Sequence, residues 1–348
     1  MLVFEPVKPI LLGATALVLF GQAPARPPIA VQISPIPRHA EAGDLWTPTI
    51  TVRRRGVPLP RARVTLRVGT VVTRAVWAGR GRYRVQVELG HVGRFTFSVT
   101  VNGRRVRSGR LVVGPPRLRG TYDVVVDRDG TLLVGDASNR VLRVFPGGLL
   151  MVVARLRFPV EVAIDPRGTF AVVTEERFVR RPNGRILATL QQPTALAYGT
   201  DGTLYVSELG GRVVRVGVDG TVAPILSEGL RQPHGLAIHG STLYVCDTFN
   251  NRLLAVDLTT GSSSTAAEDL SLPVDVTAAE DGTLYIADYG NRRIARFRAG
   301  VVTTAAPLSE ANGVAVAPDG SIYVTERALP RVLRVDPVTG AVTVVAGS

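Results

Sequence analysis

A segment of about 38 residues recurs six times in the C-terminal two thirds of the chain, and this repeat limits the folds available to it. Each copy opens with a proline or turn residue and a short apolar run. An Asp-Gly-type turn, a second apolar run and an acidic residue follow. The six copies are Thr121–Asp136, Pro159–Glu175, Pro193–Glu208, Pro233–Asp247, Pro273–Asp288 and Ala311–Glu326. Periods of this size are typical of repeat architectures.

The pattern inside one repeat predicts a four-stranded antiparallel sheet. Residues 193–226 contain four β-prone runs separated by turns with Gly or Asp, and no window is long or periodic enough for a helix. Since one such sheet cannot bury both faces alone, the copies must pack face to face, and a propeller does this with short, protected edges. We therefore expect an all-β chain with a six-bladed β-propeller over 120–348. The expected blades are 120–156, 157–190, 191–230, 231–270, 271–308 and 309–348.

The last repeat ends on its own fourth strand, Ala341–Ala346, at the end of the sequence. Ring closure is therefore expected to rely on face packing between the first and sixth blades, unless Leu111–Val113 adds a strand.

The repeat resembles a known family. Val274–Arg293 is similar almost throughout to the NHL repeat, with Asp-Gly-Thr-Leu-Tyr-Ile-Ala-Asp followed by Asn-Arg. The resemblance covers about residues 120–348. It implies a propeller related to gluconolactonase-like enzymes, to streptogramin B (virginiamycin B) lyases and to the lyase half of peptide-amidating enzymes. Many NHL propellers are binding platforms, so the resemblance predicts the fold more firmly than the function.

The first third of the chain lacks this period. Residues 1–25 read as an export signal, with the apolar stretch Ile10–Phe20 before Ala23-Pro24-Ala25; a buried strand or an uncleaved anchor is the alternative. Residues 28–114 contain about seven short β-prone runs, which predict a sandwich. The runs around Tyr83 and Phe97 look like the late strands of bacterial Ig-like domains. Residues 115–119 form a Pro-rich linker that we expect to be stiff.

Charge is divided in the same way as the strands. Residues 26–119 contain 19 arginines and three acids, a balance of +16, whereas residues 120–348 carry a balance of −3. A basic sandwich could attract an anionic envelope polymer or lipid headgroups, although an arginine-rich composition bias explains the charge equally well. Aromatic residues do not alternate with the arginines as a single-strand platform requires, so nucleic acid is not the expected partner. The single Cys246 excludes an intramolecular disulfide.

Candidate site residues follow the opening proline of each repeat, because the starts of the innermost strands surround one mouth of a propeller channel. The first position holds Tyr122, Val160, Thr194, His234, Val274 and Asn312, and the second holds Asp123, Glu161, Ala195, Gly235, Asp275 and Gly313. Adjacent strand residues point to opposite faces, so both rows cannot face the channel equally.

Three roles are expected in this window. Asp123, Thr194 and His234 are the candidate ligand-binding residues. His234 is also the candidate catalytic residue, since the related lyases place histidines here that act on metal or substrate. The resemblance to gluconolactonase-like enzymes makes Asn312 a candidate metal ligand, and Glu161 and Asp275 supply nearby carboxylates for a divalent cation, calcium or zinc. A purely structural role for Asp123, Glu161 and Asp275, bonding backbone near a strand start, is the alternative.

A second set of acids occurs once per repeat at the end of the second strand, usually four or five residues before an arginine. These acids are Asp136, Glu175, Glu208, Asp247, Asp288 and Glu326. Their six-fold occurrence predicts a turn or ion-pair role inside each blade. The leading functional hypothesis is non-catalytic recognition of a protein or small molecule by an exported protein, whether secreted, periplasmic or at the cell surface. A metal-dependent hydrolase or lyase, and a scaffold of an envelope assembly, stay open as alternatives.

Overall fold

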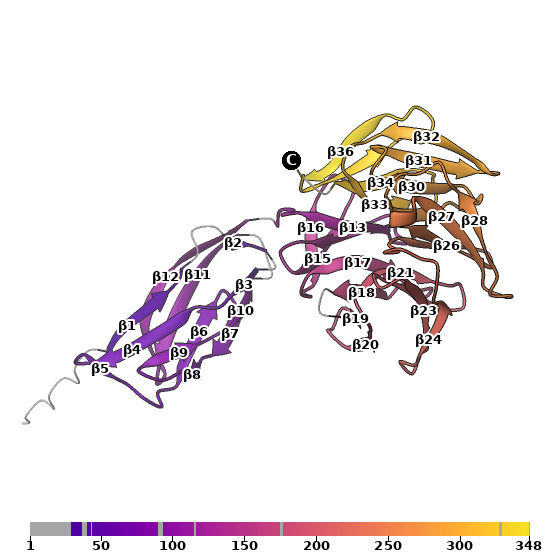
Figure 1. Ribbon diagram of the computed structural model, residues 1–348. Helices are drawn as coiled ribbons and strands as arrows, with labels where there is room; N and C mark the ends of the chain where they lie inside the picture. Colours follow the sequence, from indigo (N-terminus) through magenta and orange to yellow (C-terminus); the bar gives the residue numbers. More distant parts are fainter. Residues whose placement is uncertain are drawn as a thin grey trace, which may run out of the picture. The chain divides into compact units, whose positions relative to one another are not determined.

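The computed structural model describes residues 29–36, 40–42, 44–89, 93–114, 116–174, 177–326 and 329–347. Contacts divide the chain into two compact units (Figure 1). The first unit contains the described residues 29–36 together with 46–87 and 95–111, and the second contains the described residues within 38–45, 88–94 and 112–348. The predicted export signal, residues 1–25, lies outside the described residues. Among those residues, no helix has the length and apolar character needed to cross a membrane.

The central strands of the first unit each bury one face. In β4 (Thr49–Arg54), Ile50 and Val52 are fully buried and alternate with more exposed residues. In β6 (Val64–Val68), Leu66 faces the interior in the same way. This alternation is what a half-buried antiparallel sheet requires.

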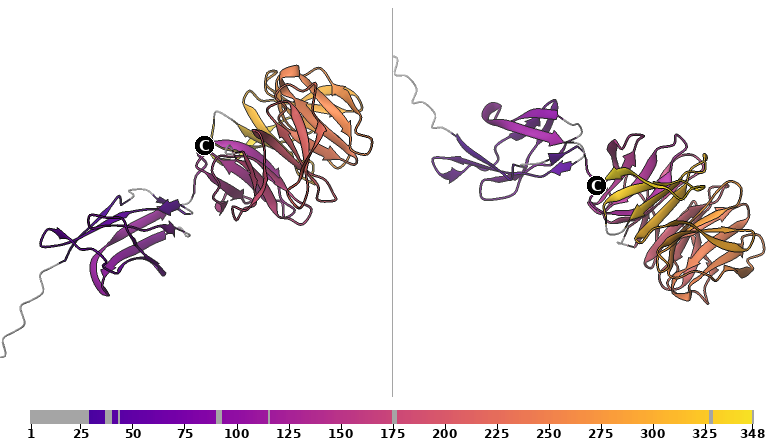
Figure 2. Two further views of the ribbon diagram at one scale, coloured as in Figure 1. Left: turned by 60° about the horizontal axis from the view of Figure 1, so that its bottom comes forward. Right: turned by 90° about the horizontal axis from the view of Figure 1, so that it is seen from above.

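The strands of the N-terminal region form two larger sheets and one small sheet (Figure 2). One sheet has the order β1-β4-β9-β8, with β5 paired to β4, and its further strands are β1 (Ile29–Ser34), β5 (Val57–Pro58), β8 (Val76–Trp77) and β9 (Arg82–Arg84). The second has the order β2-β12-β11-β6-β7, and its further strands are β2 (Ala40–Glu41), β7 (Val71–Arg74), β11 (Gly93–Val101) and β12 (Arg104–Gly114). The small sheet pairs β3 (Asp44–Trp46) with β10 (Val87–Leu89).

The repeats form successive four-stranded antiparallel sheets, and within the described part of 116–347 there are six of them. Sheets 1 to 3 contain β13 (Thr121–Val126), β14 (Leu132–Asp136), β15 (Arg140–Val144), β16 (Leu150–Ala154), β17 (Pro159–Ile164), β18 (Phe170–Thr174), β19 (Phe178–Arg180), β20 (Ile186–Thr189), β21 (Pro193–Tyr198), β22 (Leu204–Glu208), β23 (Arg212–Val216) and β24 (Val222–Leu226). Sheets 4 to 6 contain β25 (Leu236–His239), β26 (Thr242–Asp247), β27 (Arg252–Asp257), β28 (Ser263–Ala267), β29 (Pro273–Ala278), β30 (Leu284–Asp288), β31 (Arg293–Arg298), β32 (Val301–Pro307), β33 (Ala311–Val316), β34 (Ile322–Glu326), β35 (Arg331–Val335) and β36 (Val342–Gly347). A short 3-10 turn, Thr248–Asn250, follows β26.

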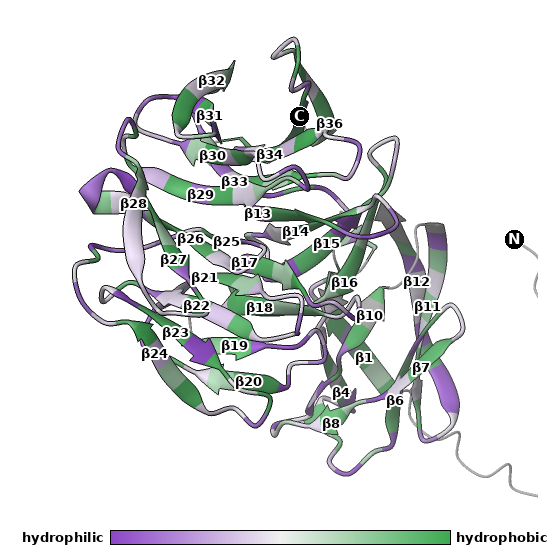
Figure 3. Cartoon of the chain, turned by 90° about the vertical axis from the view of Figure 1, so that its right-hand side faces the viewer, coloured by the Kyte–Doolittle hydropathy of each residue, from purple (hydrophilic) through white to green (hydrophobic). Residues whose placement is uncertain are grey.

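These six sheets are arranged as a closed ring, which we call the ring unit. The first strand of each sheet contacts the first strand of the next, and β33 contacts β13 to complete the cycle. The second strands are apolar on both faces, as in β18, which is green in Figure 3, because each sheet packs between two neighbours. One apolar cluster joins Val124 and Leu142 of sheet 1 to Val332 and Ala346 of sheet 6. Face packing therefore closes the ring, as expected, and β12 pairs with β2 and β11 instead of adding a strand to it.

The acid at the end of the second strand pairs with an arginine that opens the third strand, as predicted. Asp247 accepts from Arg252 Nε at 2.8 Å, and Asp288 accepts from Arg293 Nε at 2.7 Å. Equivalent pairs join Asp136 to Arg140, Glu208 to Arg212 and Glu326 to Arg331. Glu175, the sixth acid, lies outside the described residues. These recurrent acids hold strand ends together, so they belong to the architecture of the repeat.

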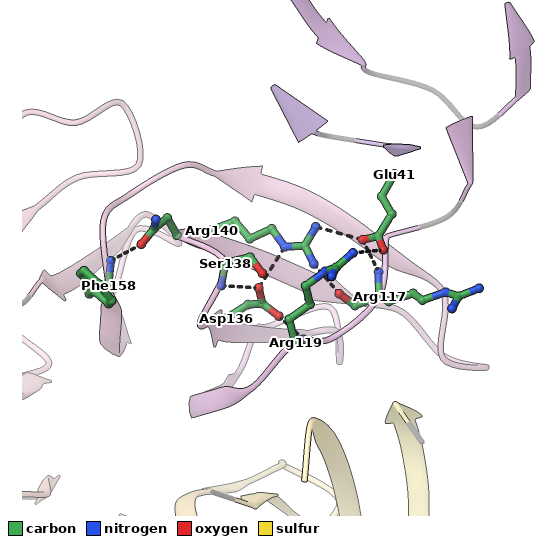
Figure 4. Close-up of polar contacts among 8 residues, drawn as sticks. Glu41, Arg117, Arg119, Asp136, Ser138, Arg140 and Phe158 are labelled. Carbon is green, nitrogen blue, oxygen red and sulfur yellow. Dashed lines mark hydrogen bonds and ion pairs between the residues drawn. The ribbon is translucent and has the colours of Figure 1, made fainter. Parts of the chain in front are cut away.

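The pair in sheet 1 is extended by Glu41, which belongs to the same contact unit (Figure 4). Arg140 donates from Nε to Asp136 at 3.0 Å and from Nη1 to Glu41 at 3.4 Å. Arg119 Nη2 donates to the other oxygen of Glu41 at 2.7 Å, and the Arg117 amide donates to Glu41 at 3.0 Å. Burial pushes the pKa of Glu41 up, but these donors outweigh it and hold the pKa below its usual range. Glu41 is therefore a charged partner of the ring unit.

Candidate functional site

The starts of the first strands enclose a cavity of about 550 Å³ on one side of the ring. Five of the sequence-predicted site residues line it together: Glu161, Thr194, His234, Asp275 and Asn312. They come from sheets 2 to 6, because the same repeat position converges on the centre of a ring. Asp123 does not line this cavity. It lies with Glu161 and Asp275 beside a second, more polar cavity of about 260 Å³, which is bordered by the first strands of the six sheets.

Asp123 and Asp275 both use their carboxylates to join neighbouring sheets. Asp123 accepts from its own neighbour, the Val124 amide, at 2.6 Å and from the Val162 amide of sheet 2 at 2.8 Å. Asp275 accepts in the same way from the Val276 amide at 2.8 Å and from the Val314 amide of sheet 6 at 2.7 Å. Each carboxylate thus satisfies backbone donors at the inner edge of the next sheet, which agrees with the structural alternative for these acids.

Glycine in the preceding sheet makes room for each of these two acids. A side chain at Gly235 of sheet 4 would place its Cβ 2.4 Å from the Asp275 Cα atom, and one at Gly313 of sheet 6 would place its Cβ 2.8 Å from the Asp123 Cα atom. Contacts this short do not occur between real side chains and backbone. The succession of Gly and Asp at the second repeat position therefore follows from the close approach of the inner strands.

Glu161 differs from the two aspartates in its surroundings. Burial is the main reason that its pKa lies well above the ordinary value of 4.5, and the charges of Asp123 and Asp275 raise it further, while the Leu196 amide opposes the shift. Burial likewise raises the pKa of Asp123 to about 7 and raises that of Asp275. Three carboxyl groups at the centre of the ring therefore disfavour one another's ionisation. Glu161 borders both cavities. Unlike the two aspartates, each of which accepts from two backbone amides, it accepts from one, that of Leu196.

Two of the other cavity residues hold the ring together. Thr194 Oγ1 donates to the Pro233 carbonyl of sheet 4 at 2.7 Å and lies 2.9 Å from Ser207 Oγ. The side-chain amide of Asn312 donates to the Tyr122 carbonyl of sheet 1. His234 is half-buried in the cavity lining, and its backbone carbonyl accepts from Ser207 at 2.8 Å. Most of the polar side chains predicted for the site therefore bridge adjacent sheets.

The arrangement of these residues fits a cation poorly. Within the described residues, no group of three or more His, Cys, Asp or Glu side chains is placed to hold a metal ion. Both oxygens of Asp275 accept backbone hydrogen bonds, and Asn312 is oriented by the Tyr122 carbonyl. Of the three predicted ligands, only Glu161 and the side-chain carbonyl of Asn312 then offer oxygen atoms, which is far short of the six to eight oxygens that calcium takes. The metal assignment of Glu161, Asp275 and Asn312 stays a prediction.

Sequence reasoning missed three residues of the cavity lining, Thr174, Gln192 and Leu209. Thr174 and Leu209 lie at or just after the end of a second strand, which pairs with the start of the first strand. Gln192 precedes the opening proline and has a positive φ of 54°, as does Phe158 in sheet 2, with a φ of 47°. The position of Gln192 directly before Pro193 is the sequence signal that could have identified it as a residue of the cavity lining.

Comparison with known proteins supports the fold and no more. No family model and no curated protein match the chain. Among solved structures, a gluconolactonase from Xanthomonas campestris is similar, with a TM-score of 0.55 and 17% identity over 66% of this chain and 87% of that one. Virginiamycin B lyase from Staphylococcus aureus has a TM-score of 0.51 and 14% identity over 65% of this chain and 83% of the enzyme. A Bacteroides thetaiotaomicron protein of unknown function has a TM-score of 0.52 and 14% identity over 87% and 96%.

These neighbours, together with the closed ring of four-stranded sheets, show that the chain has a β-propeller fold of the gluconolactonase-like type. At identities of 14 to 17%, the similarity carries no assignment of activity to this chain.

Proposed function

We propose that the ring unit is a six-bladed NHL-type propeller, preceded by an Ig-like β-sandwich, and that its central cavity binds a ligand without catalysing a reaction. The observation that carries this proposal is the use of the polar lining. Thr194, Asp275 and Asn312 are engaged in bonds between neighbouring sheets. The cavity therefore offers a preformed shape with few polar groups directed at a reacting bond, which is the usual character of a recognition site.

The proposed cellular setting rests on the sequence. An exported protein, secreted, periplasmic or at the cell surface, would present this cavity to a small molecule or a protein segment outside the cytoplasm. The strongly basic front of the chain would attach it to an anionic envelope polymer or to lipid headgroups. A cavity of about 550 Å³ lies within the usual range for small-molecule pockets, so a small organic ligand is the class that we propose first.

A ligand screen tests the recognition proposal. Small-molecule hits found by ligand-observed NMR on the full chain are expected to lose binding in a Leu209→Trp variant, because the larger ring would fill the lining of the cavity. The control is Leu329→Trp, a change at an exposed leucine that also follows a second strand but does not line the cavity. Two further compounds test for catalysis: quinupristin, which is bound in a structure of virginiamycin B lyase, and gluconolactone, after the similar gluconolactonase. Mass spectrometry is expected to show both chemically unchanged after incubation with the full chain. Turnover of either compound, or hits that persist in Leu209→Trp, would contradict the proposal.

A cation titration tests the hydrolase or lyase alternative. Calcium or zinc added to the full chain in a calorimeter is expected to give no saturable heat from the cavity, since Asp275 already accepts two backbone hydrogen bonds. Saturable binding that is lost in both Asn312→Ala and Glu161→Gln, with the fold retained, would instead favour a metal-dependent enzyme.

A further inference from the structure

A second hollow, separate from the proposed ligand cavity, lies on the outer face of the sheet β2-β12-β11-β6-β7. It has a volume of about 330 Å³ and is formed by three adjacent strands, β6, β11 and β12. Its polar side chains are of only two kinds, arginines and hydroxyls, and we call it the arginine hollow. The polar side chains are Arg67, Arg105, Arg110, Thr96, Ser98 and Ser108, and Gly109 and the buried Phe97 complete the lining.

Strand pairing explains how these side chains meet. Ser98 of β11 lies directly opposite Arg67 of β6 in the antiparallel register, so the two side chains share one face of the sheet. That face is the outward one, because Val99 and Leu66, the next pair along, are fully buried on the other side. Ser98 is 7% exposed and therefore lies low in the hollow, whereas the three arginines are exposed around it.

The charge of the hollow is not compensated by its surroundings. Residues 29–36, 46–87 and 95–111, which are the described residues of the first unit, contain 14 arginines and no aspartate or glutamate. In the ring unit, by contrast, several arginines at strand ends pair with acids, as Arg252 does with Asp247. In the part of the chain that the structure describes, Arg67, Arg105 and Arg110 form no side-chain ion pair of this kind. A cluster of cations held close together without a partner attracts an anion from solution.

The donors in the hollow select the chemistry of that anion. A guanidinium is a planar fork of N–H donors that matches phosphate and carboxylate oxygens, and a hydroxyl can donate as well. Three guanidiniums and three hydroxyls offer more donors than the two oxygens of one carboxylate can accept. A phosphate ester, with several acceptor oxygens arranged tetrahedrally, uses such a set more fully.

We propose that the arginine hollow is a binding site for the phosphate groups of a soluble phosphate-ester or polyphosphate chain. The recessed floor favours a flexible polymer over a bilayer, because a polymer can place one phosphate inside the hollow and its neighbours against the surrounding arginines. Several phosphates engaged along one chain raise the effective concentration at the site. The site is separate from the central cavity, so this proposal does not depend on the ligand that the ring unit binds.

Paired variants test whether the hollow itself is the site. Fluorescein-labelled polyphosphate is titrated with the full chain at about 0.15 M salt, where long-range attraction is largely screened. The Arg105→Gln/Arg110→Gln variant is expected to bind about tenfold more weakly or worse, because it loses two of the three charged forks. The control, Arg82→Gln/Arg84→Gln, removes the same charge from exposed arginines of β9 in the other sheet and is expected to stay within about twofold of the parent. Tryptophan fluorescence of Trp46 and Trp77 verifies that both variants fold.

Competition arms separate the chemical classes. Inorganic phosphate is expected to compete with the labelled chain, and polyglutamate at the same concentration of charge is expected to compete far less. Equal losses in the two variants would show diffuse attraction and overturn the site. Equal competition by polyglutamate would overturn the phosphate assignment. Binding only to phosphatidylglycerol vesicles, with no effect of polyphosphate, would overturn the soluble polymer as the occupant.

Discussion

Replacing Arg140 with alanine is expected to lower the free energy of unfolding of the ring unit by about 3–5 kcal/mol, the cost of breaking a buried charge pair. Arg140 is 1% exposed, and its guanidinium is shared between Asp136 and Glu41 (Figure 4). Without it, Asp136, which has no exposed surface, loses its cationic partner in a place that water cannot readily reach. The transition temperature of the ring unit should fall by on the order of 10 °C.

The same position in another repeat provides the control. Arg212 opens the third strand of sheet 3 and pairs with Glu208, but its side chain is 42% exposed. Glu208 is itself buried, but solvent reaches the pair from the arginine side, so Arg212→Ala is expected to cost clearly less than Arg140→Ala. Both tryptophans belong to the first unit, so unfolding of the ring unit is followed by far-UV circular dichroism and calorimetry. Equal losses in the two variants would contradict the role given to burial and to Glu41.

This contrast shows what the repeat predicts and what it cannot. The spacing from Asp136 to Arg140 predicts an ion pair, and the pair forms because antiparallel strands bring the end of one strand opposite the start of the next. Arg140 also pairs with Glu41, 99 residues earlier in the sequence, and in the described parts of the other repeats no second acid joins the ion pair. The available signal was composition, since Glu41 is one of only three acids among the 19 arginines of residues 26–119.

The candidate site divides in the same way. Convergence of Thr194, His234 and Asn312 on one cavity follows from the repeat alone, because equivalent positions of a ring lie around its axis. Which of them serve the architecture does not follow, because it depends on atoms of the next sheet. Thr194 lies near the Pro233 carbonyl, and Asp275 reaches the Val314 amide, only once the inner strands approach closely. Sequence reasoning predicts which repeat positions converge, and the hydrogen bonds show which of those side chains bond to a neighbouring sheet.

Glu161→Gln is expected to stabilise the ring unit at pH 8 and to leave its stability almost unchanged at pH 4. The amide has nearly the same shape as the carboxyl group, and its oxygen can still accept from the Leu196 amide. What it removes is a buried negative charge beside Asp123 and Asp275. Relieving an unpaired buried charge is expected to contribute about 2 kcal/mol or more.

The sign follows from the direction of the pKa shift. The pKa of Glu161 in the folded protein lies above its ordinary value of 4.5, so the folded state holds the proton that the unfolded state releases. The stabilising effect of this proton is complete below pH 4.5 and is lost as the pH rises toward the pKa of the folded state. The difference in unfolding free energy between Glu161→Gln and the parent should therefore grow with pH, measured in urea titrations at pH 4, 6 and 8.

An exposed glutamate isolates this effect from general charge. Glu268 lies on the surface of the loop after β28, so Glu268→Gln removes the same charge and should give no growing difference between pH 4 and 8. If Glu161→Gln behaves like Glu268→Gln, the Glu161 carboxyl group is hydrated or paired. The claim that burial and the two neighbouring aspartates raise its pKa would then be wrong. If the difference grows as expected, the protein keeps an acid there at a cost in stability. Such a cost would agree with the ligand-recognition role proposed above, in which the Glu161 carboxyl group faces the cavity.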